Sequence, residues 1–134
     1  MSKTTVRTDQ APTPIASFSQ GSAKGGLLQV AGQVGFDPAT GVPVGPGLRE
    51  QIDQTLRNVQ AVLEAGGSGW GDVIMTRVYL TDTAHFAELN AVYDAWFAEV
   101  LPEGGFPART TVYVGLPAGL LVEIDALAVL TAGS

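Results

Sequence analysis

The chain has no cysteine, and only one of its 134 residues is a histidine. The lack of cysteine excludes disulfide bonds, thiolate metal sites and a cysteine nucleophile in this sequence. The single histidine, His85, has no neighbouring ligand residues, and the aspartates are scattered without the short spacing typical of metal ligands. We therefore expect no metal site.

Basic residues and long apolar runs are also scarce. Seven lysines and arginines stand against thirteen aspartates and glutamates, so the formal net charge is −6. A net-acidic chain is poorly suited to bind nucleic acid, which requires a clustered basic surface. No apolar run approaches the roughly 18 residues that span a bilayer, and the first residues, MSKTTVRTDQAPTP, lack the apolar middle of a secretory signal. We expect a cytoplasmic protein without membrane contact, a single domain over residues 1–134 with a polar arm over 1–12.

The apolar pattern predicts strands and two amphipathic helices. Between residues 46 and 65 apolar side chains recur at spacings of four, four, three and four, which places them on one face of a helix. A second stripe of this kind runs from Phe86 to Val100, after a stretch of capping residues. Strands are predicted over residues 18–21, 27–34, 72–80, 108–114 and 120–130. This order predicts an α+β two-layer domain, a mixed sheet with both helices on one face.

The last two predicted strands carry charged residues among aliphatic ones. Side chains alternate between the faces of a strand, and the helices are expected to cover the purely apolar faces. Arg109, Glu123 and Asp125 are then predicted on the far side of the sheet, beside Leu121, Leu127 and Val129. A face that mixes charges with large aliphatic side chains is typical of a subunit interface, so we predict an oligomer.

Arg109 and Glu123 are candidates for small-molecule chemistry at that interface. A guanidinium is a rigid two-donor fork that matches a carboxylate. A half-buried carboxylate with a raised pKa can exchange protons near neutral pH. The alternative is a structural ion pair between strands or subunits, which spacing alone favours.

Several motifs recur in the order found in one known family. They are GQ at 32–33, DPATG at 37–41, LRNV at 56–59, NAVYDAWF at 90–97, FPARTTV at 106–112 and LVEIDA at 121–126. From about residue 11 to residue 130 the chain resembles the Rid family of reactive-intermediate deaminases, also called YjgF/YER057c/UK114. The combination of FPAR with the later VEI segment is the most specific part of the resemblance.

The resemblance implies a chorismate-mutase-like fold that assembles as a homotrimer with clefts between subunits. Members hydrolyse enamine and imine products of pyridoxal-phosphate enzymes, such as 2-aminoacrylate, to a 2-keto acid and ammonia, without metal or organic cofactor. It implies that Arg109 binds the substrate carboxylate and that Glu123 positions or activates the attacking water. Asn90 is expected near the cleft, with backbone amides close to Gly32 and Thr111.

Three positions depart from the usual pattern of the family. Phe18 replaces a tyrosine and Ala31 replaces a serine, so two hydroxyls are lost, and Thr111 stands where a cysteine is common. These changes favour a subgroup that acts on a larger or more apolar substrate. The same changes also fit two other interpretations: weak deaminase activity, or catalysis relocated to Tyr113 or Asp125.

Four functions stay open at this point. The first is a hydrolase of small 2-imino acids, and the second a pathway-specific enzyme acting on a larger enamine. Arg109 and Glu123 fit both equally. The third is a trimer that binds a small carboxylate without turnover, which the lost hydroxyls favour. The fourth, the ribonuclease or translation-inhibitor activity with which some members are labelled, is disfavoured by the net charge of −6.

Overall fold

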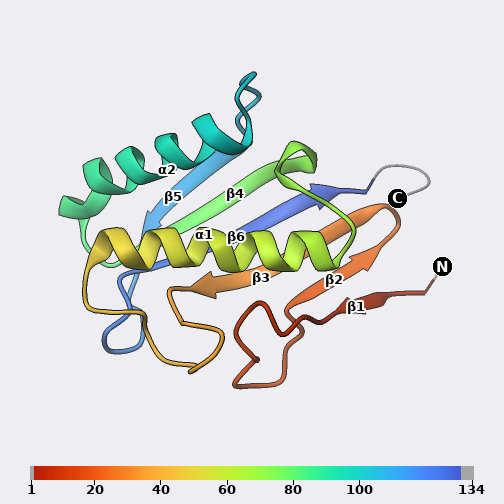
Figure 1. The fold of residues 1–134 in the computed structure, drawn as a ribbon, viewed down its shortest axis with the longest axis horizontal. Coiled ribbons are helices and arrows are strands. Elements are labelled where there is room, and N and C mark those ends of the chain that lie inside the picture. Colours follow the sequence, from red (N-terminus) through yellow and green to blue (C-terminus); the bar gives the residue numbers. More distant parts are fainter. Residues whose placement is uncertain (1, 131–134) are drawn as a thin grey trace.

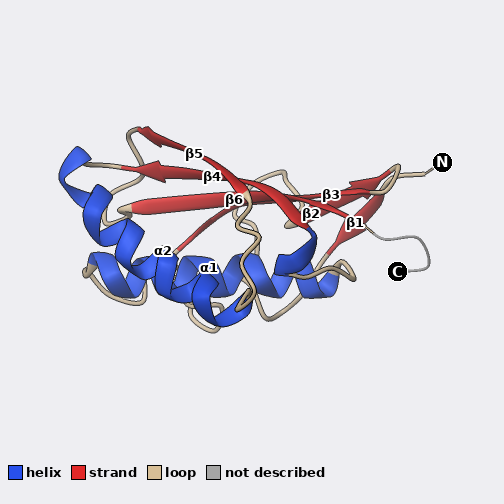
Figure 2. Ribbon diagram, turned by 90° about the horizontal axis from the view of Figure 1, so that it is seen from above, coloured by secondary structure: helices blue, strands red, loops and turns tan. Residues whose placement is uncertain are grey.

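The computed structural model describes residues 2–130, which form a six-stranded sheet with two helices packed on one face (Figures 1 and 2). The strands are β1 (Thr4–Val6), β2 (Gly21–Lys24), β3 (Leu27–Val34), β4 (Val73–Leu80), β5 (Ala108–Tyr113) and β6 (Val122–Val129). The helices are α1 (Leu48–Ala65) and α2 (Phe86–Val100). Two short 3-10 turns, Trp70–Asp72 and Thr83–His85, directly precede β4 and α2. The predicted two-layer α+β architecture is confirmed.

The strand order across the sheet is β1-β2-β3-β6-β4-β5. Every pair is antiparallel except β4 with β5, which α2 connects as a parallel crossover. The last strand, β6, lies between β3 and β4. The connection from β3 through α1 to β4 therefore skips one position in the sheet, which β6 fills. This arrangement places the two charged strands β5 and β6 on either side of β4, and not next to each other.

The core forms between α1 and the sheet. The apolar stripe predicted for this helix is fully buried, as shown by Ile52, Leu56, Val59 and Leu63. The helix ends where Gly67 takes a positive φ of 82°, a conformation that glycine adopts at little cost. Opposite α1, β6 contributes its fully buried face: Val122, Ile124, Ala126 and Ala128. Neither helix within residues 2–130 is long and apolar enough to cross a membrane.

The N-terminal region contains a strand that was not predicted, and one expectation for it is wrong. The arm over residues 1–12 contains β1, an edge strand of three residues that pairs with β2 and is too short to show an alternation in the sequence. Residues 18–20 do not form a strand, because β2 starts only at Gly21. Phe18 lies instead in a loop whose start is held by the side chain of Gln20, which hydrogen-bonds to the carbonyls of residues 8, 11 and 12.

Candidate functional site

Arg109 and Glu123 lie on opposite faces of the sheet, which corrects the prediction that they share the far side. Arg109 pairs with Thr76 of β4, whose hydroxyl hydrogen-bonds to Tyr93 of α2, so this face is the one that the helices cover. Glu123 alternates with the buried residues of β6 and therefore faces away from the helices. The prediction failed because it took the valines of β5 for core residues. Val112 is 38% exposed, since α2 covers the other face of this edge strand.

The Arg109 side chain is held against α2. Its Nη2 donates a 2.7 Å hydrogen bond to Oδ1 of Asn90. The centre of the guanidinium lies 4.8 Å from the ring centroid of Tyr93 and 5.7 Å from that of Phe86. Among the described residues no carboxylate forms an ion pair with Arg109. The arrangement presents an oriented, always charged fork to an incoming anion.

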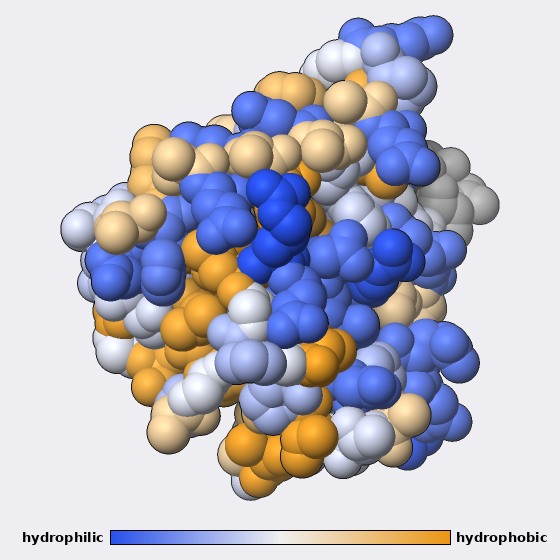
Figure 3. Space-filling model, turned by 60° about the vertical axis from the view of Figure 1, so that its left-hand side comes forward, coloured by the Kyte–Doolittle hydropathy of each residue, from blue (hydrophilic) through white to orange (hydrophobic). Residues whose placement is uncertain are grey.

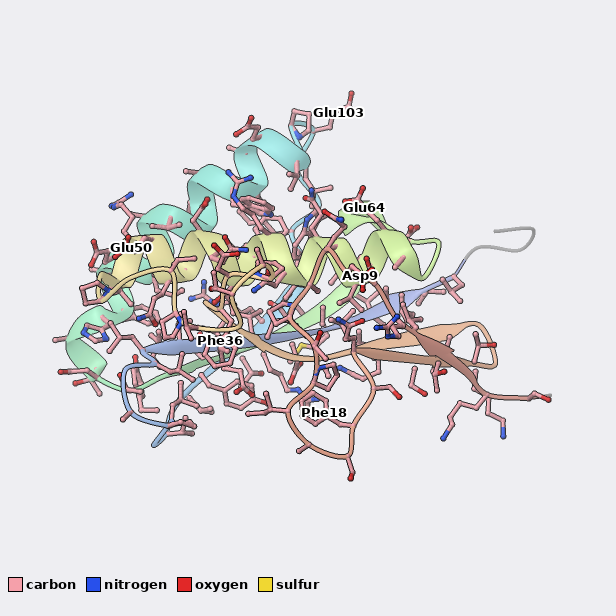
Figure 4. All side chains as sticks on the ribbon, turned by 60° about the horizontal axis from the view of Figure 1, so that its bottom comes forward. Asp9, Phe18, Phe36, Glu50, Glu64 and Glu103 are labelled. Atoms are coloured by element: carbon pink, nitrogen blue, oxygen red, sulfur yellow. The ribbon has the colours of Figure 1, made fainter. Side chains whose placement is uncertain are left out.

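Glu123 lines a pocket of about 210 Å³ on the opposite face. Its walls come from three separate segments of chain: the loop before β2, the end of β3 with its following turn, and the loop before β6. Phe18 of the first segment and Phe36 of the second are labelled in Figure 4. The lining residues are Pro12, Thr13, Pro14, Ile15, Phe18, Gly32, Gln33, Val34, Phe36, Pro117, Leu120 and Glu123. Most of this wall is apolar, and Glu123 is its only charged group.

Burial raises the pKa of the Glu123 carboxyl, and the negative charge of Asp125 raises it further. The carboxylate packs directly over the backbone of β3 at Gly32. A Cβ atom placed at Gly32 would overlap Oε2 of Glu123 and lie 2.8 Å from its Cδ. Glycine at this position therefore leaves the space that the carboxylate occupies, where β3 is irregular between Val30 and Gln33.

The raised pKa predicts how stability depends on pH. Below the unfolded-state pKa, near 4.5, the Glu123 carboxyl is protonated in both the folded and the unfolded state. As the pH rises through the higher folded-state pKa, the native protein must hold a half-buried charge and loses stability. In Glu123→Gln this loss is absent. We expect the free energy of unfolding of Glu123→Gln, relative to wild type, to increase from about pH 4 to about pH 8, by on the order of 1 kcal/mol or less. Urea unfolding across this range measures it, and a difference independent of pH would contradict the shift.

The other predicted site residues divide between the two faces. Phe18, 49% exposed, and Gly32 line the Glu123 pocket, whereas Asn90 lies with Arg109. Thr111 follows Arg109 on the same face of β5, and its buried hydroxyl has no hydrogen-bond partner. Ala31 is not among the lining residues; its carbonyl accepts a hydrogen bond from the Gln33 side chain.

The two residues considered as substitute catalytic groups differ in their surroundings. Asp125 is tied into the sheet, because Nε of Arg77 lies 3.0 Å from each of its oxygens and the Tyr79 hydroxyl lies 3.0 Å from Oδ2. Tyr113 is 43% exposed at the end of β5. Within residues 2–130, no three histidine, aspartate or glutamate side chains are grouped as metal ligands are.

Sequence reasoning missed most of the pocket wall. Ile15, Phe36, Pro117 and Leu120 come from three irregular loops, and no periodic pattern connects positions that lie more than twenty residues apart. The one available signal was the proline content of the segments 12–14 and 117, since proline restricts a loop to few conformations.

Comparison with known proteins agrees with the geometry. The family model described as Endoribonuclease L-PSP matches residues 8–130. A 2-iminobutanoate/2-iminopropanoate deaminase of Salmonella typhimurium is 41% identical over 130 residues, which cover 96% of this chain and 98% of that protein. A RutC family protein of Pyrococcus horikoshii is 42% identical over 127 residues, 94% of this chain and 97% of the relative.

Solved structures show the same fold. The crystal structure of Escherichia coli TdcF with bound serine superimposes with a TM-score of 0.89 at 33% identity, over 96% of this chain and 99% of that one. Both the sequence match and the superposition extend over nearly the whole chain, including the strands that carry Arg109 and Glu123. The protein therefore belongs to the Rid family, the YjgF and L-PSP proteins.

Proposed function

We propose that the protein is a cofactor-free hydrolytic deaminase that converts small 2-imino acids to 2-keto acids and ammonia. The observation that carries this proposal is the half-buried Glu123 carboxyl, whose pKa is raised and which stands as the one ionisable group in an otherwise apolar pocket. A carboxyl group with a raised pKa is a stronger base than an exposed one and is better suited to accept a proton from water. The similarity to imine deaminases at about 40% identity supports the same reaction class.

The site is completed between copies of the chain. Arg109 and Glu123 lie on opposite faces, so one substrate can contact both only if they come from different subunits. The face that carries Glu123 also exposes Leu27, Val112 and Val129, which are 47%, 38% and 39% accessible. Apolar patches remain at the surface (Figure 3). A homotrimer, implied by the family, joins these unlike faces in a closed ring.

The mechanism requires only these groups. Arg109 binds the substrate carboxylate and thereby orients the imine carbon toward the Glu123 pocket. Glu123 accepts a proton from water as the water oxygen bonds to that carbon, which gives a tetrahedral carbinolamine. The carboxyl then returns this proton to the nitrogen. As the C–N bond breaks, Glu123 takes the proton of the carbinolamine hydroxyl and passes it to the leaving nitrogen, so the products are a 2-keto acid and ammonia. Serine in the TdcF structure has the charge and size of such a substrate.

A larger, more apolar substrate is the second candidate. The observation that favours it is the apolar pocket wall, to which Ile15, Phe18 and Phe36 contribute. Phe18 lies on the loop before β2 and Phe36 just after β3 (Figure 4), so both can contact the side chain of a substrate held near Glu123. The same enzyme chemistry would then act on an imine with a longer carbon chain.

Binding without turnover is the non-enzymatic alternative, and one assay separates it from the proposed function. An amino acid dehydratase generates 2-aminoacrylate or 2-aminocrotonate, and the release of keto acid is timed with and without this protein. We expect acceleration by wild type and a loss of about 10²–10⁴-fold in Glu123→Gln, because general acid–base catalysis contributes that much. The exposed Glu103→Gln makes the same charge change and is the control. Folded wild-type protein that gives no acceleration would refute the deaminase.

A further inference from the structure

We propose that three buried amide side chains, Gln20, Gln51 and Asn58, are positioning residues that set the width of the Glu123 pocket and so its selectivity for the size of the substrate side chain. The proposal rests on the proposed function. These residues are 2%, 0% and 0% exposed, and each one binds the backbone of a different segment of the pocket wall.

Gln51 holds the wall that precedes β6. From α1, its Nε2 donates hydrogen bonds to the carbonyls of Gly119 at 2.8 Å and Gly45 at 2.9 Å. Its Oε1 accepts from the N–H of Leu121 at 2.9 Å. The segment between these contacts carries Leu120, a lining residue that lies three positions before Glu123. One side chain therefore fixes both the loop and the start of the strand that holds the candidate base.

Asn58 holds the wall that follows β3. Two turns after Gln51 on the same helix, its Nδ2 donates to the carbonyls of Val34 and Phe36, each at 2.9 Å. Both residues line the pocket. The amide of Gln54 donates to Oδ1 of Asn58 at 2.8 Å and keeps the side chain in this orientation.

Gln20 holds the third wall, the loop that carries Ile15 and Phe18. Its Nε2 donates to the carbonyl of Pro12 at 2.9 Å and to that of Thr8 at 3.0 Å, while its Oε1 accepts from the N–H of Thr8 at 2.7 Å. The start of the loop is thus tied down where it enters the pocket.

The three walls share a physical problem. Residues 12–18 and 117–120 lie outside the strands, and the third wall leaves the sheet after Val34, so strand pairing alone does not determine how far apart the walls stand. A buried amide that binds two or more backbone groups fixes that spacing. If its hydrogen bonds were broken, these backbone groups would be left unpaired in the interior. Since the walls are apolar, their spacing decides which hydrocarbon substituent fits, and one methylene changes discrimination in such a pocket by about 10–200-fold.

The test compares kcat/KM for 2-imino acids with methyl, ethyl, isobutyl and benzyl side chains, generated by an amino acid oxidase. Gln51→Met and Asn58→Leu keep the volume and remove the hydrogen bonds. We expect the ratio of kcat/KM for large over small substrates to change by about tenfold or more in these variants. Val59→Ala, fully buried on the same helix, is the control that lowers the melting temperature without altering the ratio. If the two helix variants do not fold, Gln20→Met, directly before β2, is tested in their place.

Three results would overturn the positioning role, and the first two are distinct from failure of the proposed function. Variants that fold and retain the wild-type substrate ratio overturn it, as does a shift of the same size in Val59→Ala. If wild type turns over no imine, the proposed deaminase function fails. The positioning role is then tested without catalysis, by the ratio of affinities for 2-keto acids with large and small side chains, measured by NMR titration. Wild type that binds none of these keto acids overturns both.

Discussion

Mixed oligomers of Arg109→Ala and Glu123→Gln subunits are expected to regain activity that neither variant has alone. Because Arg109 and Glu123 lie on opposite faces of one chain, each site of the proposed assembly would take them from different subunits. In a ring of randomly mixed subunits, about one site in four receives both an intact arginine and an intact glutamate. An equimolar mixture should therefore show about a quarter of the wild-type keto-acid release.

The measurement is simple to control. The variants are unfolded together, refolded and assayed, and the same two proteins mixed without unfolding should stay inactive as long as subunits do not exchange. Co-refolding Arg109→Ala with Asn90→Ala is the matched negative control, because both substitutions damage the same half of the site. If co-refolded Arg109→Ala and Glu123→Gln remain inactive although mixed oligomers have formed, the site is not shared between subunits.

Gly32→Ala is expected to reduce kcat by about 10²-fold with little change in stability, because displacement of a reacting group by about 1 Å has effects of this size. The added methyl group would occupy the position of the Glu123 carboxylate, so the flexible side chain must move away from its place over β3. Gly32 does not have a positive φ, so alanine introduces no backbone strain there.

Steady-state kinetics and thermal unfolding of Gly32→Ala separate the two effects. Gly71→Ala makes the same substitution where a Cβ meets nothing within 4 Å, and it should leave kcat unchanged. A Gly32→Ala protein with wild-type kcat would mean that Glu123 need not sit over Gly32 for catalysis. A protein that loses stability and activity together would point to distorted β3 instead of a displaced carboxylate.

Much of the secondary structure follows from local patterns. The helix from Leu48 to Ala65 has a clear periodicity and the strand from Leu27 to Val34 is rich in apolar residues, and the structure confirms both elements. The segment Thr4–Val6 had no such pattern, because an edge strand of three residues is too short for an alternation and is specified by its pairing with β2. The boundary near Phe18 was missed because a side chain, Gln20, supplies hydrogen bonds to that loop from a neighbouring position.

The candidate site was determined in part by the sequence. Residue types, their order and the motifs around Arg109 and Glu123 identify the family, because these depend on which side chains exist. Which face each side chain occupies is a different kind of information. Strand alternation relates neighbours within β5 or within β6, but it does not say which face of an edge strand a helix covers. Only the packing of α2 over β5 placed Arg109 on the opposite face from Glu123.

The pocket itself belongs wholly to the tertiary structure. Its walls consist of residues 12–18, 32–36 and 117–123. The last two segments meet because β3 and β6 are neighbours in the sheet. Side-chain amides from α1 and from Gln20, directly before β2, bind the backbone of the loops. Contacts across nearly one hundred positions leave no local signal, since their energy depends on where the whole chain has packed. The sequence by itself determined most of the elements and the candidate reactive groups, and the three-dimensional packing decided which of them can meet.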